Sequence, residues 1–354
     1  MKFSITFVFT FLFLLVLGYF LYVNQRPLLQ DFSPSGRRLA PEAEEQSEGR
    51  LLSLATGEEI ISLALEGGQN HPRIVLSKEP AGWFLTEPVY SAADPVMVDG
   101  LLMALTVAQK VRNLTREKEW AEYGLDKPEV WVEVGLQDSG VKRTQTLYFG
   151  HSSPVGDYVY ARWVHPDGGA EAVKEAEYFM LDSPLKRAFV RSLYTLRQKR
   201  IFEKPMDKIK KIQWHTAEGN YEWAQEEGLW FWTEPLGLLG ETAQISFIQN
   251  LQAGLRDIYV KEFLDGRMAD DPEAQISPLG PKISLVDDSG EASTLYLGRE
   301  WSQRDAYFAA KQGEKALLLL ARSNVQSLLK LVQSQAASNS NPTGSRLPAA
   351  TWNR

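Results

Sequence analysis

Histidine and cysteine carry much of the chemistry in proteins, and this chain offers little of either. It has four histidines and no cysteine. No histidine stands three or four residues from another, and none has carboxylates at metal-ligand spacing; they are His71, His151, His165 and His215. The lack of cysteine excludes thiol nucleophiles, disulfides and soft-metal sites. We therefore expect no metal, no cofactor and no catalysis by histidine.

Two short motifs resemble nucleophile signatures, and each lacks a necessary part. Residues 150–154 read Gly-His-Ser-Ser-Pro, close to the G-x-S-x-G turn of serine hydrolases, but Pro154 replaces the last glycine. Residues 183–186 read Ser-Pro-Leu-Lys, the S-x-x-K spacing of serine acyltransferases, without the companion motifs. A serine at the start of a helix explains this second motif as well. We expect a non-enzymatic protein, and a hydrolase assembled from distant residues is the least favoured alternative.

A repeated motif is the most informative feature of the chain. Residues 83–88 read Trp-Phe-Leu-Thr-Glu-Pro, and residues 230–235 read Trp-Phe-Trp-Thr-Glu-Pro, 147 positions later. The shared order of this and further pairs predicts a tandem duplication of one domain-sized module. The further pairs are 148 positions apart: residues 146–150 with 294–298, and residues 157–161 with 305–309.

The repeated side chains are candidates for an interface rather than for catalysis. Glu87 and Glu234 recur with the module, as do Asp157 and Asp305, and duplication of a surface turn explains them better than a catalytic carboxylate pair. Tryptophans can anchor a partner or stack on sugars, but they also fill cores. We expect Trp83 and Trp230 in the core and leave the orientation of Trp232 open. The repeat-motif positions are Trp83, Glu87, Pro88, Asp157, Trp230, Trp232, Glu234, Pro235 and Asp305.

Each copy has the pattern of several strands with helices between them. Residues 130–136 alternate valine with other residues, which is the period of a half-buried strand. Asp94 followed by Pro95 predicts the start of a helix, and we expect another helix over residues 185–197. The expected fold class is α+β, with an N-terminal transmembrane helix followed by two tandem repeats of a mostly antiparallel sheet with packed helices.

The two ends of the chain differ from its middle. Residues 3–23 contain no charge and are long enough, at about 1.5 Å per residue, to cross a membrane. We expect an uncleaved anchor, and a cleaved signal peptide is the alternative. The expected parts are a cytoplasmic tip and anchor over 1–26, a flexible stalk over 27–57, repeats over 58–204 and 205–333, and a disordered tail over 334–354.

The charge balance excludes some partners. The chain carries a formal charge of −7, and residues 1–26 hold two basic and no acidic side chains, so the remainder carries −9. Such a balance argues against nucleic acid and against tight adhesion to anionic lipid headgroups. Basic residues stand on both sides of the apolar segment, so the charge count leaves its orientation open.

These motifs together resemble an uncharacterised bacterial family, a domain of unknown function of the DUF4340 type. The resemblance runs from about Glu58 to about Leu331 and includes the N-terminal anchor. It rests on the repeated Trp-to-Pro strand, the acidic residue before an apolar helix, Tyr123-Gly124-Leu125, the L-Y-x-G segment and the following D-x-Y/F turn. Ser277-Pro278-Leu279 is the expected counterpart of Tyr123-Gly124-Leu125 in the second copy.

The family occurs beside ABC transporters of the gliding-motility type. The resemblance implies a single-pass protein of the bacterial inner membrane with its repeats on the periplasmic side, and it supplies no catalytic residues. We expect an accessory or scaffold protein whose partners are the membrane and the permease and ATPase subunits of such a transporter. The alternative is a cell-envelope glycan-binding protein that uses exposed aromatic side chains.

Overall fold

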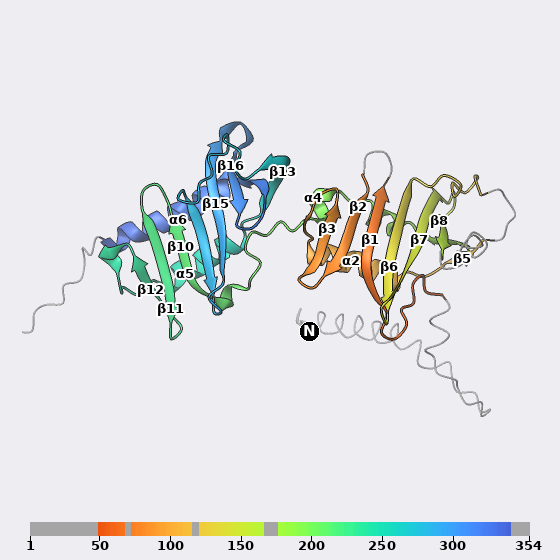
Figure 1. Cartoon of the computed structure of the whole chain (residues 1–354), viewed down its shortest axis with the longest axis horizontal. Helices are drawn as coiled ribbons and strands as arrows, with labels where there is room; N and C mark the ends of the chain where they lie inside the picture. The colour runs from red at the N-terminus through yellow and green to blue at the C-terminus, as the bar shows by residue number, and fades with distance from the viewer. Residues whose placement is uncertain (1–48, 68–71, 115–119, 166–175, 341–354) are drawn as a thin grey trace, which may run out of the picture. The chain divides into compact units, whose positions relative to one another are not determined.

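Two large antiparallel sheets make up most of the structure (Figure 1). The computed structural model describes residues 49–67, 72–114, 120–165 and 176–340. Both sheets belong to one compact unit of the chain.

The first sheet has nine strands in the order β4-β3-β2-β1-β6-β7-β8-β9-β5. Val130, Val132 and Val134 alternate along one strand and are buried, so the valine pattern marks the face that carries the core. The strands are β1 (Glu59–Gly67), β2 (Ile74–Glu79), β3 (Gly82–Glu87), β4 (Ser91–Ala92), β5 (Arg112–Asn113), β6 (Val130–Asp138), β7 (Val141–Ser152), β8 (Tyr158–Val164) and β9 (Glu177–Asp182).

The second sheet has eight strands in the order β12-β11-β10-β14-β15-β16-β17-β13. This order is that of the first sheet without a counterpart of β4, where only an isolated bridge joins Phe231 to Thr242. One duplicated module predicts such agreement. The strands are β10 (Ile209–His215), β11 (Asn220–Glu226), β12 (Leu229–Glu234), β13 (Val260–Met268), β14 (Lys282–Asp287), β15 (Ala292–Trp301), β16 (Ala306–Lys311) and β17 (Ala316–Ala321).

Helices cover one face of each sheet. Asp94 accepts hydrogen bonds from the backbone N–H groups of Val96 and Met97, so it caps the first long helix as expected. The α-helices are α2 (Pro95–Val107), α3 (Ser183–Phe189), α4 (Leu193–Leu196), α5 (Ile245–Arg256) and α6 (Arg322–Ser340); the short 3-10 helices are η3 (Met206–Lys208), η4 (Leu236–Leu238) and η5 (Ser302–Arg304).

Each sheet and its helices enclose a separate core. In the first, Leu101 and Leu105 of α2 pack with Leu63 and Leu76 of β1 and β2. In the second, Leu251 and other residues of α5 pack with tryptophans from β10, β11 and β12. The opposite face of the first sheet, here called the outer face, carries no helix and is open to solvent.

The expected fold class is wrong. Of the described residues, 45% are in strands and 23% in helices, so the structure is mostly β rather than α+β. The reason is the extent of the two sheets, which hold nine and eight strands. The expected helix over 185–197 is interrupted: α3 stops at Phe189, and the chain restarts as the single turn α4. Ser192 accepts a hydrogen bond from the Thr195 N–H and so caps that new turn, which separates the two helices.

The expected transmembrane helix over residues 3–23 lies outside the described residues. Within residues 49–67, 72–114, 120–165 and 176–340, no helix combines the length and apolar character needed to cross a membrane.

The inner ends of the two segments that we expected to be flexible are part of the fold. Leu51 and Leu52 are buried in the first core, and the Leu51 N–H donates to the Ala108 carbonyl, so these residues belong to the fold and not to a stalk. At the other end, α6 continues through Ser340, past residue 333. Residues 341–354 lie outside the described part, and the boundary between residues 204 and 205 stays a prediction.

The structure corrects one alignment between the copies. The His151 N–H donates to the Tyr123 carbonyl, and the Arg299 N–H donates to the Ala274 carbonyl in the same way. Gly124 and Gln275, the residues that follow these carbonyls, both have positive φ. The counterpart of Tyr123-Gly124-Leu125 is therefore Ala274-Gln275-Ile276, not Ser277-Pro278-Leu279.

The environment of Asp287, at the end of β14, predicts that the stability of the fold depends on pH in the acid range. Its buried carboxylate pairs with Lys204 and accepts hydrogen bonds from Ser289 and Glu291, which together hold the pKa of Asp287 well below its usual value. A depressed pKa stabilises the folded state above the ordinary pKa of about 3.9, and this stability is lost as the pH falls below that value. The free energy of unfolding of wild type, measured with urea, should therefore fall more steeply below about pH 4 than that of Asp287→Asn.

The neighbouring Asp288→Asn is the matched control, since Asp288 is half exposed and lies 3.8 Å from Lys208. A difference in free energy of unfolding between wild type and Asp287→Asn that stays constant from pH 7 down to the lowest pH at which both fold would contradict this prediction.

Candidate functional site

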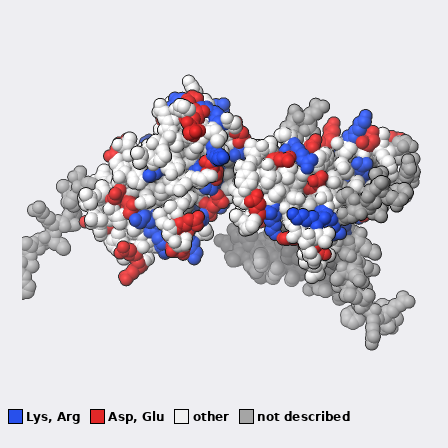
Figure 2. Space-filling model, viewed as in Figure 1, with Lys and Arg blue, Asp and Glu red and all other residues white. Residues whose placement is uncertain are grey.

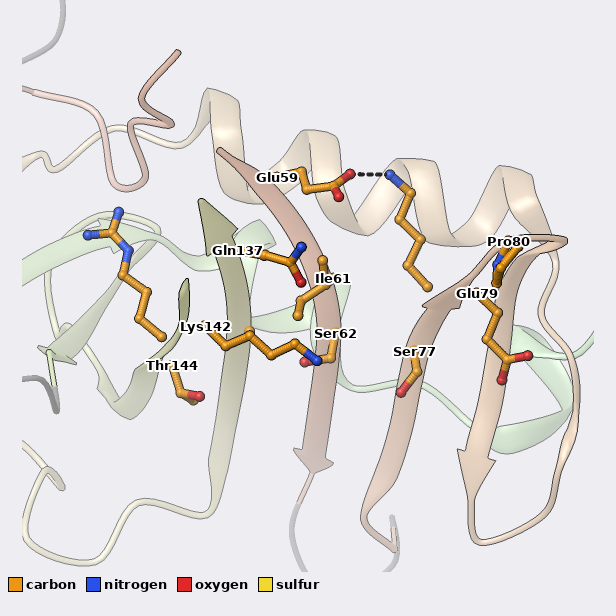
Figure 3. Close-up of a pocket in the computed structure, with 12 residues that line it drawn as sticks. Glu59, Ile61, Ser62, Ser77, Glu79, Pro80, Gln137, Lys142 and Thr144 are labelled. Carbon is orange, nitrogen blue, oxygen red and sulfur yellow. Dashed lines mark hydrogen bonds and ion pairs between the residues drawn. The ribbon is translucent and has the colours of Figure 1, made fainter. Parts of the chain in front are cut away.

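A row of small side chains crosses the outer face of the first sheet. Ser77 of β2 pairs in register with Ser62 of β1, Ser62 with Gly135 of β6, and Gly135 with Thr144 of β7. A groove of about 560 Å³ lies over this row. Figure 3 shows Ser62 and Ser77 on adjacent strands, with the end of the Lys142 side chain beside Ser62.

A bulge in β1 creates the floor of the groove. The register between β1 and β6 shifts between Ile60 and Ser62, which places Ser62 opposite Gly135. A Cβ atom on Gly135 would lie only 2.1 Å from the Ser62 hydroxyl oxygen, so the two residues fit together because one has no side chain. Hydroxyls and backbone therefore line the row itself, and Ile61 and Pro80 add apolar surface to the groove.

Most charges around the groove are already paired. Lys78 donates to Glu59 at 2.6 Å, and Arg143 pairs with the buried carboxylate of Glu58. Lys142 makes no ion pair with any residue that the structure describes. Lysine and arginine are interspersed with acidic residues over the face seen in Figure 2. Lys142 is thus the cation that a ligand in the groove would meet first.

A second row on the same face alternates aromatic rings with a cation. Trp131 of β6 pairs with Tyr148 of β7, Tyr148 with Arg162 of β8, and Arg162 with Tyr178 of β9. The Arg162 guanidinium lies 4.5 Å from the centre of the Tyr148 ring, within the range of a cation–π contact. Trp120 stacks on Tyr178 with ring centres 3.8 Å apart. These contacts make a firm rim beside the groove.

The second sheet differs from the first at this row. The positions that match Ser62 and Gly135 by strand pairing are Lys211 and Val286, which have larger side chains. A smaller groove, of about 330 Å³, lies beside Ala292 and Thr294 of β15. Burial alone would raise the pKa of Glu222, but hydrogen bonds from Gln213, Lys211 and Thr233 hold it below its ordinary value.

The three tryptophans of the repeated motif do not form a surface. Trp232 is fully buried and packs against Trp223, with ring centres 4.8 Å apart, and against Phe247. Trp230 is buried in the same core, and Trp83 is half buried against the first core. The core position expected for Trp230 is confirmed. Trp232, whose orientation the sequence did not decide, also lies in the core.

The repeated acidic residues and prolines lie at turns. Glu87 and Glu234 end β3 and β12, and the bonds to Pro88 and Pro235 are both cis. Glu87 is exposed and lies 3.8 Å from Arg73. The structure places the two glutamates on different sheets and not in one carboxylate pair.

Asp157 and Asp305 have the same structural role in the two copies. The Asp157 carbonyl accepts from the Ser183 N–H, and the Asp305 carbonyl accepts from the Arg322 N–H, so these bonds tie the turns before β8 and β16 to the first residues of α3 and α6. Arg187 lowers the pKa of the exposed Asp157 carboxyl by a hydrogen bond, and Ser183 does so as well. Ser183, the serine of the Ser-Pro-Leu-Lys motif, therefore has a structural role in this turn.

Lys186, the lysine of the Ser-Pro-Leu-Lys motif, also has a structural role. The Lys186 ammonium donates to the Gly150 carbonyl at 2.8 Å, and burial lowers the Lys186 pKa. His165 Nε2 lies 3.4 Å from Glu177 Oε1, and His215 Nδ1 lies 2.8 Å from Asn220 Oδ1. His71 lies outside the described residues. Among those described, no three histidine or acidic side chains are grouped to hold a metal ion.

Sequence reasoning missed the residues of the groove and its rim. The alternation of β6 marks Trp131, Glu133 and Gly135 as residues that face away from the core. That signal was present in the sequence. Which of these residues meets Ser62 depends on the bulge in β1, and no sequence pattern gives that.

The comparisons with known proteins give one match. A family model described as "Domain of unknown function (DUF4340)" matches residues 83–282, from β3 of the first sheet to the start of β14 in the second. No curated protein and no solved structure matches the chain.

Proposed function

Because the chain belongs to the DUF4340 family, a domain of unknown function, we propose that it is a membrane-anchored accessory or scaffold protein of a gliding-motility-type ABC transporter. In this proposal residues 3–23 hold the chain in the bacterial inner membrane, and the two sheets lie on the periplasmic side. The protein performs no chemistry of its own. It presents the outer face of the first sheet to the transporter.

The groove over Ser62 and Gly135 carries the proposal. The two copies share one strand order and the same bulge, so nothing in the backbone requires small side chains at this row in the first sheet and larger ones in the second. Proteins use open grooves with convergent polar groups to bind other molecules. The asymmetry between the copies therefore supports a binding role for the first sheet and a supporting role for the second.

Filling the groove should remove the partner. Thr144→Arg places a long side chain over the small residues of the row, and we expect at least a tenfold loss of permease and ATPase recovered with the full-length protein after gentle detergent extraction. Ala292→Arg is the matched control, since Ala292 pairs with Val286 as Thr144 pairs with Gly135. Recovery of the transporter subunits is measured by crosslinking in native membranes and mass spectrometry.

Two outcomes would contradict the proposal at different levels. Failure of the wild-type protein to recover any permease or ATPase subunit would remove the transporter role. Equal recovery with Thr144→Arg and Ala292→Arg would keep that role but remove the groove from it.

The glycan-binding alternative needs aromatic surfaces other than those in the repeated motif, whose tryptophans lie in the cores. Trp131 and Tyr148 on the outer face are the candidates. One face of the Tyr148 ring is covered by Arg162, and Arg73 lies 5.4 Å from the Trp131 ring centre, so less ring surface is free for stacking. A change in tryptophan fluorescence on titration with envelope oligosaccharides would favour this alternative.

A further inference from the structure

Helix α2 presents an apolar stripe to solvent in addition to the stripe that it buries. Val98, Leu101 and Leu105 face the first core. On the other side, Val96 is 68% exposed, Met103 65% and Val107 58%. Asp99 is the only charged residue of the helix. A helix that is apolar all round is normally buried, so the outer stripe of α2 lacks a partner within the described chain.

The second copy shows that the fold does not need this outer stripe to be apolar. The buried residues Ile248, Leu251 and Leu255 of α5 match Val98, Leu101 and Leu105 of α2 at a constant offset. With that offset, the counterparts of Val96, Gly100, Met103 and Val107 are Ser246, Asn250, Ala253 and Asp257. All of these except Ala253 are polar. The apolar stripe is thus a property of α2 and not of the module.

Gly100 lies in the middle of the outer stripe and has no reason to be glycine within its own fold. It is exposed in a helix interior, its φ is not in the left-handed region, and an added Cβ would meet no atom within 4 Å. Glycine weakens a helix interior relative to alanine. A missing side chain does, however, let a second helix come close.

The stripe has the spacing of a helix–helix seam. Val96, Gly100, Met103 and Val107 follow one another at steps of four, three and four residues, as do the contact positions of paired helices. When the stripe is placed against its own copy in the antiparallel direction, Val96 meets Val107 and Gly100 meets Met103. The longest side chain then lies over the residue that has none.

We propose that α2 pairs with α2 of a second copy of this chain, in antiparallel orientation about a twofold axis. Such an interface uses the same patch on both chains. No lysine or arginine interrupts it, and the antiparallel direction places opposite helix dipole ends side by side. Beside the seam, Pro184 and Ala188 of α3 and Ala104 and Ala108 line an apolar groove of about 480 Å³, which extends the contact.

This dimer goes beyond the proposed transporter role and does not depend on it. Formation of the pair requires only two copies of the chain, and the outer face of the first sheet is on the opposite side from α2. Loss of the transporter would leave the dimer unaffected.

Introduced cysteines test the pairing, because the chain has none of its own. Full-length Val96→Cys and full-length Val107→Cys are prepared separately and mixed under mild oxidation. The antiparallel pair predicts a disulfide-linked dimer in the mixture and at least tenfold less in either variant alone. The matched control is a mixture of Ser246→Cys and Asp257→Cys, at the corresponding positions of α5, which should give no more linked dimer than its separate components.

Two results would overturn the proposal. One is a mixture of Val96→Cys and Val107→Cys that links no better than the α5 control. The other is Val96→Cys alone linking as well as the mixture, which would indicate a parallel or non-specific contact.

Sedimentation equilibrium of the full chain gives a second, thiol-free readout. Met103→Lys should weaken self-association by at least tenfold with an unchanged circular dichroism spectrum, since Met103 is exposed in the monomer. Gly100→Ala should raise Tm while weakening self-association, because it strengthens the helix and blocks the close approach. An unchanged association constant in both variants would overturn the proposal.

Discussion

Replacing Trp232 by alanine is expected to lower the free energy of unfolding by about 3–5 kcal/mol. Trp232 has no exposed surface, and its ring packs on Trp223 and Phe247 in the middle of the second core. Its indole N–H has no hydrogen-bond partner among the described residues, so the loss comes from packing and not from a broken hydrogen bond. Urea unfolding of the full chain, followed by circular dichroism, measures the change.

Trp131→Ala is the control for this experiment. Trp131 is half buried on the outer face and contributes to no core cluster. Its replacement should cost about 1 kcal/mol or less, as is usual at surface positions. An equal loss in the two variants would mean that the motif tryptophan is no more important for the fold than a surface one.

The repeat and most of the strands were predictable because their signals are local. The alternating valines of residues 130–136 predicted β6, and the Asp94-Pro95 pair predicted the start of α2. A copy of Trp-Phe-x-Thr-Glu-Pro needs no structure to be recognised. Local periodicity decides which residues face the core, and two modules with the same order of local signals form sheets with the same strand order.

The ends of the helices were not predictable from the sequence. Residues 185–197 are apolar enough to continue as one helix, and α3 nevertheless ends at Phe189. In the second copy, α6 continues for 19 residues from the equivalent place. Helix length is decided by tertiary packing more than by propensity, so the same starting signal gives a short helix once and a long helix once.

The candidate site was not predictable because it depends on register. Ser62, Ser77, Gly135 and Thr144 come from four strands, and nothing in the sequence places them in one row. Without the bulge between Ile60 and Ser62, a different residue of β1 would face Gly135 and the alternation of the faces would reverse. The second sheet has the same bulge, between Ile209 and Lys211, but Lys211 and Val286 stand in the equivalent row, so the groove needs small side chains as well as the bulge.

Gly298→Ala is expected to destabilise the protein by about 3 kcal/mol, at the upper end of the cost of overpacking. A Cβ on Gly298 would lie 2.2 Å from the Ala274 carbonyl oxygen, which is backbone and cannot rotate away. The same carbonyl accepts the Arg299 N–H, so a shift would also break this hydrogen bond. Gly150→Ala should behave alike in the first copy, where the Cβ would lie 2.1 Å from the Tyr123 carbonyl oxygen.

The comparison of these two glycines tests the duplication itself. Gly150 and Gly298 end the TLYFG and TLYLG segments, and each faces the carbonyl of a loop that has diverged completely in sequence, Tyr123-Gly124-Leu125 against Ala274-Gln275-Ile276. Gly219→Ala, where an added Cβ meets nothing within 4 Å, is the control and should change stability by less than about 1 kcal/mol. If urea unfolding showed a loss for only one of the two glycines, the loop would be held differently in the two copies, and the shared backbone geometry would not be a common requirement of the module. Equal losses would mean that the module preserves the close approach of strand and loop backbone, which depends on glycine, while the side chains of the loop are free to change.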